Sequence, residues 1–160
     1  MELRWIGTPN IQRWWNVTLI LLAGLAISAC GVSKSDLPNG ESQKEFGQVV
    51  PVDSDGTYTD IIPQELATML EDKDFLFVNV HVPYDGELPD TDAFIPFDKI
   101  PDFINDLPED KNSKVVVYCR SGSMSSVAAQ DLVRMGYTNV YNLDGGFRAW
   151  SAAGFEFIAP

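Results

Sequence analysis

Two uninterrupted apolar runs limit most strongly what this chain can fold into. They read DFLFVNVHV from Asp74 and KVVVYC from Lys114. Runs in which apolar and β-branched residues follow one another directly are typical of strands covered on both faces, as in parallel sheets between layers of helices. A third run of this kind, NVYNL, begins at Asn139. We therefore predict an α/β fold with a mostly parallel central sheet flanked by helices.

The segments beside these runs carry helical patterns. In IIPQELATMLEDK, Pro63 suits a first helical turn, and Leu66 and Leu70 fall on one face. PFDKIPDFINDLP predicts a short helix, and SSVAAQDLVRMGY predicts a longer one that stops at Gly136. Helices and strands thus alternate along the chain, as crossover connections between parallel strands require.

Cys119 ends the second apolar run and is followed by RSGSMS, a turn of small residues. Parallel sheets bind ligands outside the carboxyl ends of their strands, so this cysteine stands where such folds present chemistry. The next helix would direct its N-terminus at the sulfur and favour the thiolate, which is the nucleophilic form. Ser121, Gly122 and Ser123 would let the backbone approach a bound anion, and Arg120 would add a positive charge. The alternative, a buried structural thiol, fits poorly with a strand end before a glycine-containing turn.

YCRSGSMS, together with GYTNVYNLDGGFRAWSAAGFEF further on, resembles the second half of a rhodanese domain. The resemblance runs from about Tyr58 to Ile158. It implies a rhodanese-like fold and an active-site loop of six residues, 119–124, whose backbone N–H groups hold an anionic sulfur species. It also implies Cys119 as the catalytic residue, with a substrate-binding set of Arg120, Ser121, Gly122, Ser123, Met124 and Ser125.

The activity that this resemblance implies is sulfur transfer. The Cys119 thiolate would attack the outer sulfur of thiosulfate or a similar small anionic donor, keep that sulfur as a persulfide, and pass it to a thiol or cyanide acceptor. No cofactor is expected. No general base is needed either, because the nucleophile is already ionised and the leaving group is a stable anion. No metal is expected either, since His81 is the only histidine and a Cys/His zinc site would lack ligands.

Three places depart from the family pattern. Met124 stands where many members have arginine, so one guanidinium that would hold an anionic donor is absent. Asn79, Val80 and His81 replace an Asp-Val-Arg motif, and GELPDTDAFIP replaces the usual Gly-His-Ile-Pro-Gly-Ala segment. We expect His81 to form hydrogen bonds within this variant loop. Asp144, which precedes two glycines, could be an acid near the cysteine, but we expect it to serve a turn and to cap a helix.

Two other functions stay open at this point. A rhodanese-fold module could carry or sense sulfur, or bind anions, without useful turnover, because the loop lacks that arginine; a turnover assay separates it from an enzyme. A cysteine phosphatase on the same fold would need an arginine six positions after the nucleophile to clamp phosphate, and that position is Ser125.

Residues 1–30 differ in kind from the rest of the chain. Arg4 and Arg13 precede NVTLILLAGLAISAC, which carries no charge and ends at Cys30. This is the layout of a secretory signal peptide, with an uncleaved signal anchor as the alternative. The stretch ISAC resembles the lipobox of bacterial lipoproteins. That resemblance implies removal of residues 1–29, a lipid on Cys30, and an extracytoplasmic domain anchored to a bacterial membrane.

Residues 30–56 are rich in Gly, Ser, Pro, Asp and Asn and show no sustained period. This composition predicts a flexible tether, although FGQVVPV would also suit packing on the domain. The domain is therefore expected over residues 57–160. The formal net charge of -12, with 11 basic residues that form no dense patch, argues against nucleic acid as a partner.

Overall fold

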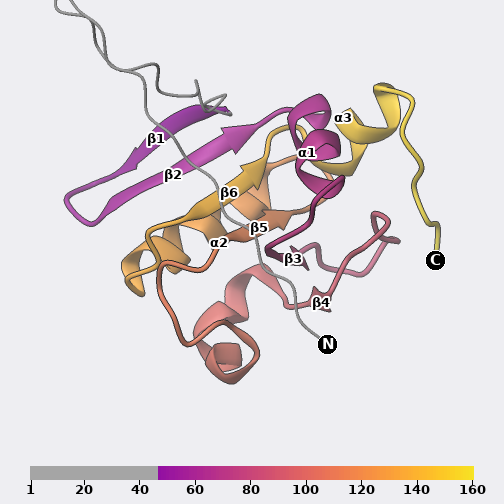
Figure 1. Ribbon diagram of the computed structural model, residues 1–160. Coiled ribbons are helices and arrows are strands. Elements are labelled where there is room, and N and C mark those ends of the chain that lie inside the picture. The colour runs from indigo at the N-terminus through magenta and orange to yellow at the C-terminus, as the bar shows by residue number, and fades with distance from the viewer. Residues whose placement is uncertain (1–46) are drawn as a thin grey trace, which may run out of the picture. The chain divides into compact units, whose positions relative to one another are not determined.

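The computed structural model describes residues 47–160. Its six strands form one sheet in the order β1-β2-β6-β5-β3-β4 (Figure 1). The strands are β1 Gln48–Val52, β2 Gly56–Ile61, β3 Leu76–Asn79, β4 Ala93–Phe94, β5 Val115–Tyr118 and β6 Val140–Leu143. β1 and β2 pair antiparallel, and every other neighbouring pair is parallel. The predicted α/β fold with a mostly parallel sheet is confirmed.

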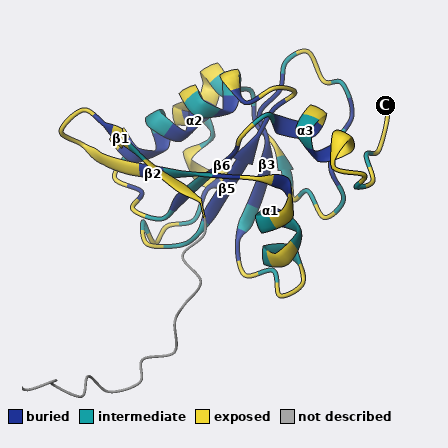
Figure 2. Cartoon of the chain, turned by 90° about the horizontal axis from the view of Figure 1, so that it is seen from above, coloured by how far each residue is buried: buried dark blue, intermediate teal, exposed yellow. Residues whose placement is uncertain are grey.

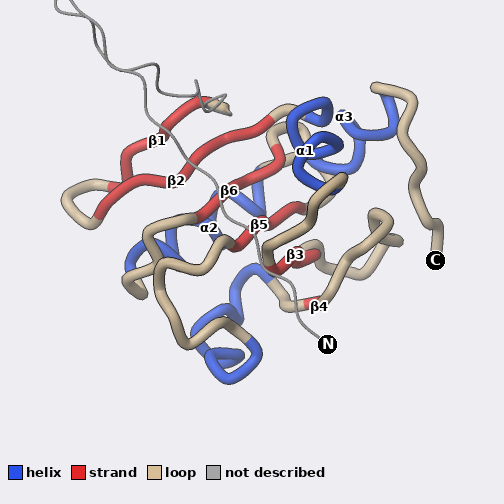
Figure 3. The backbone as a smooth tube through the Cα atoms, in the orientation of Figure 1, coloured by secondary structure: helices blue, strands red, loops and turns tan. Residues whose placement is uncertain are grey.

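Helices cover both faces of this sheet (Figures 1 and 3). They are α1 Pro63–Leu70, the 3-10 helix η1 Phe97–Asp106, α2 Ser123–Arg134 and α3 Gly146–Ala152. Residues of α2 and η1 share one buried cluster with the sheet, and residues of α1 and α3 share another. The helix after Cys119 begins two residues earlier than the quoted pattern SSVAAQDLVRMGY, which places Ser123 in its first turn.

β5 shows why the apolar runs do not alternate with polar residues. Val115, Val117 and Cys119 belong to the cluster under α2 and η1, whereas Val116 and Tyr118 belong to the cluster under α1 and α3. All five side chains are buried, and Figure 2 shows the central strands as the most buried part of the chain. Each fully buried aliphatic or aromatic side chain of this size stabilises the fold by about 1.5–3 kcal/mol. The strand that ends at Cys119 is therefore anchored on both faces.

The domain begins earlier than the expected boundary at residue 57. β1 pairs with β2 from Gln48 opposite Asp60 to Val52 opposite Gly56, so part of FGQVVPV lies in the sheet and not in a tether. Val52 is buried in the cluster under α2, which gives the hairpin its apolar anchor. β1 carries Pro51 and forms one edge of the described sheet, and the two-residue strand β4 forms the other.

The expected signal peptide, Cys30 and residues 30–46 of the expected tether lie outside the described residues. Within residues 47–160, no helix has the length and apolar character needed to cross a bilayer.

Candidate active site

Cys119 lies directly after β5, at the carboxyl end of the parallel strands, and its side chain is 1% exposed. Its sulfur accepts a hydrogen bond from the Gly122 N–H, with a nitrogen to Sγ distance of 3.2 Å. The Ser125 hydroxyl donates from 3.4 Å. Hydrogen bonds of this kind are stronger when the acceptor carries a negative charge. The N-terminus of α2 adds to this effect, since the helix begins at Ser123.

The Ser125 hydroxyl has a second acceptor, the Gly122 carbonyl oxygen, at 3.1 Å. A hydroxyl carries a single proton, so donation to sulfur competes with donation to this carbonyl. A thiolate is the stronger acceptor of the two and would draw the proton to Sγ. Ser125 is fully buried, and it therefore holds the nucleophile from inside the domain.

The turn between β6 and α3 holds the cysteine in place from the other side. The Phe147 N–H donates to the Cys119 carbonyl at 3.0 Å, and the Arg148 N–H donates to the Arg120 carbonyl at 3.1 Å. Gly146 makes this close approach feasible, because its φ is +56° and a Cβ there would collide with the Cys119 carbonyl oxygen. Gly146, the second glycine of NLDGGF, is thus part of the site. A glycine pair in the sequence predicts a turn but does not predict this contact.

The predicted substrate-binding residues fall into two groups. Arg120 and Ser121 follow the cysteine in a short exposed turn, and Gly122, at φ +92°, is the residue before α2. Ser123, Met124 and Ser125 belong to the first turn of α2, so the expected six-residue loop is shorter and ends in a helix. Met124 is partly buried against the cluster under α2. Arg120 is the one charged residue in the segment 119–125.

Arg120 faces a carboxylate that the sequence did not single out. Its Nη1 lies 3.7 Å from an Asp85 carboxylate oxygen, and the two side chains are 45% and 47% exposed. Asp85 lies between β3 and β4, directly before the stretch GELPDTDAFIP that departs from the family pattern. A lone aspartate in a loop carries no signal for such a contact, because the contact depends on how the loop folds over the sheet.

His81 lies beside this pair but makes no hydrogen bond through its buried Nδ1 within the described residues. Its ring packs edge-on against Phe147, with 5.7 Å between ring centroids. Burial lowers the pKa of His81, Asp85 opposes this, and Arg120 adds to it. The expectation that the His81 side chain hydrogen-bonds within the loop is therefore wrong for Nδ1.

Asn79 provides the hydrogen bonds that His81 does not. Its side-chain Nδ2 donates to the Gly86 carbonyl at 2.9 Å, and its Oδ1 accepts from the His81 N–H at 3.0 Å. Asp144 lies in the turn after β6, as expected, but it does not cap α3, whose N-cap is Gly145 with no side-chain hydrogen bond. Among the residues that the structure describes, no group of three His, Cys, Asp or Glu side chains is placed to hold a metal ion.

A family model for the rhodanese-like domain matches residues 63–153. The chain belongs to the rhodanese-like domain family. A sulfurtransferase of Allochromatium vinosum is 36% identical to it over 105 residues, which cover 63% of this chain and 95% of that protein. A thiosulfate sulfurtransferase of Pseudomonas syringae is 37% identical over 92 residues, covering 56% of this chain and 84% of that protein.

Other rhodanese-like relatives have different names. A tRNA uridine(34) hydroxylase of Synechocystis is 29% identical over 119 residues, covering 71% of this chain but 41% of that protein. Among solved structures, the rhodanese-like domain of an Anabaena protein superposes with a TM-score of 0.54 at 24% identity, covering 63% of this chain and 79% of that one. That likeness supports the fold alone, and the rhodanese-like fold expected from the sequence is confirmed.

Proposed function

We propose that this rhodanese-like protein is a sulfurtransferase that moves a sulfane sulfur through a persulfide on Cys119. The observation that carries the proposal is the sulfur at the end of β5, which accepts hydrogen bonds from the Gly122 N–H and the Ser125 hydroxyl before the N-terminus of α2. The sulfurtransferases among its relatives are matched over most of their length, which supports the same activity here. The hydroxylase is matched over less than half of its length.

The first half-reaction exchanges one sulfur–sulfur bond for another. The second breaks the sulfur–sulfur bond of the persulfide and forms a carbon–sulfur bond to cyanide or a sulfur–sulfur bond to a thiol. The Cys119 thiolate attacks the outer sulfur of thiosulfate, and the departing sulfite takes the electron pair of the broken bond. The persulfide then yields its outer sulfur to cyanide, or to a thiolate, and the Cys119 thiolate is restored. Neither step needs an external proton, because thiolate and sulfite are both stable anions.

Mass spectrometry after treatment with thiosulfate tests this proposal directly. We expect one added sulfur on the peptide that contains Cys119, and release of that sulfur on addition of cyanide. Cys119→Ser should lose turnover by at least about a thousandfold, since an alcohol is a far weaker nucleophile than a thiolate. Cys30→Ala is the matched control and should keep the persulfide. Stable persulfide without catalytic turnover would favour the sulfur-carrier or sensor alternative, and wild-type turnover in Cys119→Ser would overturn both.

We also propose that Cys30 carries a lipid and holds the domain on the outer side of a bacterial membrane. Support comes from the uncharged stretch that ends in ISAC and the two arginines before it. In cells fed a labelled fatty acid, the membrane-fraction protein should carry label and lack residues 1–29. Cys30→Ala should block both labelling and processing, and unprocessed wild-type protein in the cytosol would contradict the proposal.

A further inference from the structure

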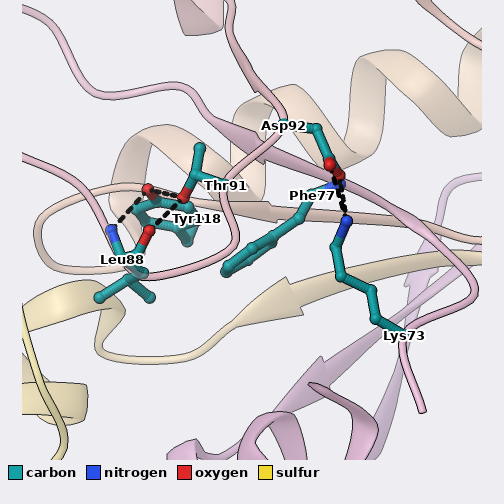
Figure 4. Close-up of polar contacts among 6 residues, drawn as sticks. All are labelled: Lys73, Phe77, Leu88, Thr91, Asp92 and Tyr118. Atoms are coloured by element: carbon teal, nitrogen blue, oxygen red, sulfur yellow. Dashed lines mark hydrogen bonds and ion pairs between the residues drawn. The ribbon is translucent and has the colours of Figure 1, made fainter. Parts of the chain in front are cut away.

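The loop that carries Asp85 is fixed to the body of the domain from several sides. We refer to residues 80–92 as the Asp85 loop. The buried side chain of Asn79 holds the Gly86 carbonyl. The Tyr118 hydroxyl, at the end of β5, accepts from the Leu88 N–H at 3.0 Å and lies 2.7 Å from the Thr91 hydroxyl (Figure 4).

Two further contacts complete this anchoring. Asp92 accepts from the Phe77 N–H at 2.7 Å and pairs with Lys73 at 2.6 Å (Figure 4). On the far side, Glu87 and Ile158 exchange both backbone hydrogen bonds, at 2.8 and 2.9 Å. The loop is therefore held by the sheet and by residues near position 158, so the place of Asp85 is set by tertiary structure.

This anchoring puts a negative charge beside the cysteine segment. Asp85 lies 3.7 Å from Arg120, which is the charged residue of residues 119–125. A second carboxylate, that of Asp144, borders the same turn, because a Cβ on Gly122 would lie 3.6 Å from its Oδ1. Arg148 is exposed on α3, one residue after the amide that binds the Cys119 carbonyl. The two carboxylates and the two guanidinium groups sum to zero charge. The guanidinium that follows the cysteine, that of Arg120, is already paired with Asp85.

We propose that Asp85 is a specificity-determining residue, and that by neutralising Arg120 it makes the site favour sulfur donors with one negative charge over the dianion thiosulfate. The inference rests on the proposed sulfurtransferase function. The interaction of a fixed charge with a donor scales with the charge of the donor, so the carboxylate disfavours a dianion more than a monoanion. Methanethiosulfonate is a suitable monoanion, because it has the same sulfonyl–sulfur bond as thiosulfate with a methyl group in place of one charged oxygen.

Both donors follow the same balanced step. The Cys119 thiolate forms a bond to the outer sulfur, the bond between that sulfur and the sulfonyl sulfur breaks, and its electron pair leaves with sulfite or with methanesulfinate. The enzyme is left as the same persulfide in each case. Differences in kcat/KM between the donors thus report the charge environment of the site rather than different chemistry.

The experiment compares wild type with Asp85→Asn on the two donors. Asp85→Asn should raise kcat/KM about fivefold for thiosulfate and about twofold for methanethiosulfonate, since a partly exposed charge acts with half the energy on the monoanion. The gain for thiosulfate should shrink as ionic strength rises from 0.1 M to about 1 M, because the screening length falls from about 10 Å to about 3 Å.

The matched control is Asp53→Asn. Asp53 lies 3.6 Å from Arg134, in a similar exposed pair at the opposite end of α2 from Cys119. The substitution Asp53→Asn removes the same charge and should leave kcat/KM unchanged for both sulfur donors. Equal gains for both donors, no gain, or the same gain in Asp53→Asn would overturn the inference while the sulfurtransferase function stands. Failure of wild type to form a persulfide with either donor would remove the function, and this inference with it.

Discussion

Two segments meet at the nucleophile, and they are held in place by different means. Within residues 119–125 the cysteine sulfur is held by near neighbours, the Gly122 N–H and the Ser125 hydroxyl, while the amides that follow Gly146 hold the backbone from a distant part of the chain. The Asp85 loop is fixed by side chains and backbone groups that are distant in sequence, from Tyr118 to Ile158. The comparison indicates that the hydrogen bonds to the sulfur come from residues close in sequence, whereas the charge beside it depends on contacts across the domain.

The largest expected effect comes from breaking the backbone contact behind the cysteine segment. Gly146→Ala should lower the free energy of unfolding by about 3 kcal/mol, because it adds the cost of a left-handed residue to a steric collision with the Cys119 carbonyl. Urea unfolding measures this change. Gly154→Ala is the control, since Gly154 has φ +89° but no atom within 4 Å of its Cβ position, and it should cost about 1–2 kcal/mol. Equal costs for the two variants would show that the close approach to Cys119 does not matter.

The next effect concerns the anchor of the Asp85 loop. Asn79→Ala should lower the free energy of unfolding by about 2 kcal/mol, because it leaves the Gly86 carbonyl and the His81 N–H without their partner inside the domain. Denaturant titration gives the value. Asn112→Ala removes an exposed amide that donates to Asp110 and accepts from the Thr138 hydroxyl, and because water replaces these exposed partners it should stay within about 0.5 kcal/mol of wild type. A similar small change in Asn79→Ala would mean that the loop is held by its other contacts.

Tyr118 joins the two segments, since it precedes Cys119 and binds the Asp85 loop. Tyr118→Phe should lower the free energy of unfolding by about 1 kcal/mol, the usual value for a lost buried hydrogen bond. Val116→Ala is a comparison for lost packing on the same face of the sheet. Thermal unfolding at neutral pH measures it. A variant as stable as wild type would show that the hydroxyl adds no net stability to the Asp85 loop.

The same tyrosine predicts a pH dependence. Burial raises the pKa of Tyr118 to about 12, above the 10.0 of an ordinary tyrosine. Between these two values the folded state keeps a proton that the unfolded state has released, so stability is complete below pH 10 and falls as the pH rises toward 12. Tyr118→Phe should flatten that part of the stability curve, and an unchanged slope would contradict the assignment.

The smallest expected effect is on the use of thiosulfate, and it comes from a change within residues 119–125. Met124→Arg should raise kcat/KM for thiosulfate about threefold, because a partly exposed cation attracts the dianion only modestly through solvent. Steady-state kinetics with thiosulfate measures it, and Met124→Gln controls for the loss of the apolar side chain. A gain shared by Met124→Gln would show that charge is not its cause.

The sequence predicts the first of the two segments far better than the second. The apolar runs and the helical pattern around Cys119 are local signals, and they locate β5, α2 and the cysteine between them. The start of the helix at Ser123 was missed because serine and glycine suit a loop as well as a first helical turn. Strand β1 lies in the segment whose composition predicts a tether, although FGQVVPV also suits packing on the domain. Only its pairing with β2 makes a strand of five residues with Pro51 inside it.

The Asp85 loop shows where local reasoning ends. No periodicity marks residues 80–92, and contacts such as that of Glu87 with Ile158 join positions far apart in the chain. His81 is expected from the sequence to form hydrogen bonds within the loop, but its ring packs against Phe147, and the Asn79 side chain makes the bond to the Gly86 carbonyl.

The two edges of the described sheet bear on how the protein behaves when it is crowded with copies of itself. An open strand edge is a template for pairing with another chain, and fibrils grow by adding strands there. At one edge β1 carries Pro51, which has no N–H to offer, and at the other β4 contributes only two residues. A formal net charge of -12 further opposes close approach between molecules. These features of the described sheet oppose edge-to-edge aggregation.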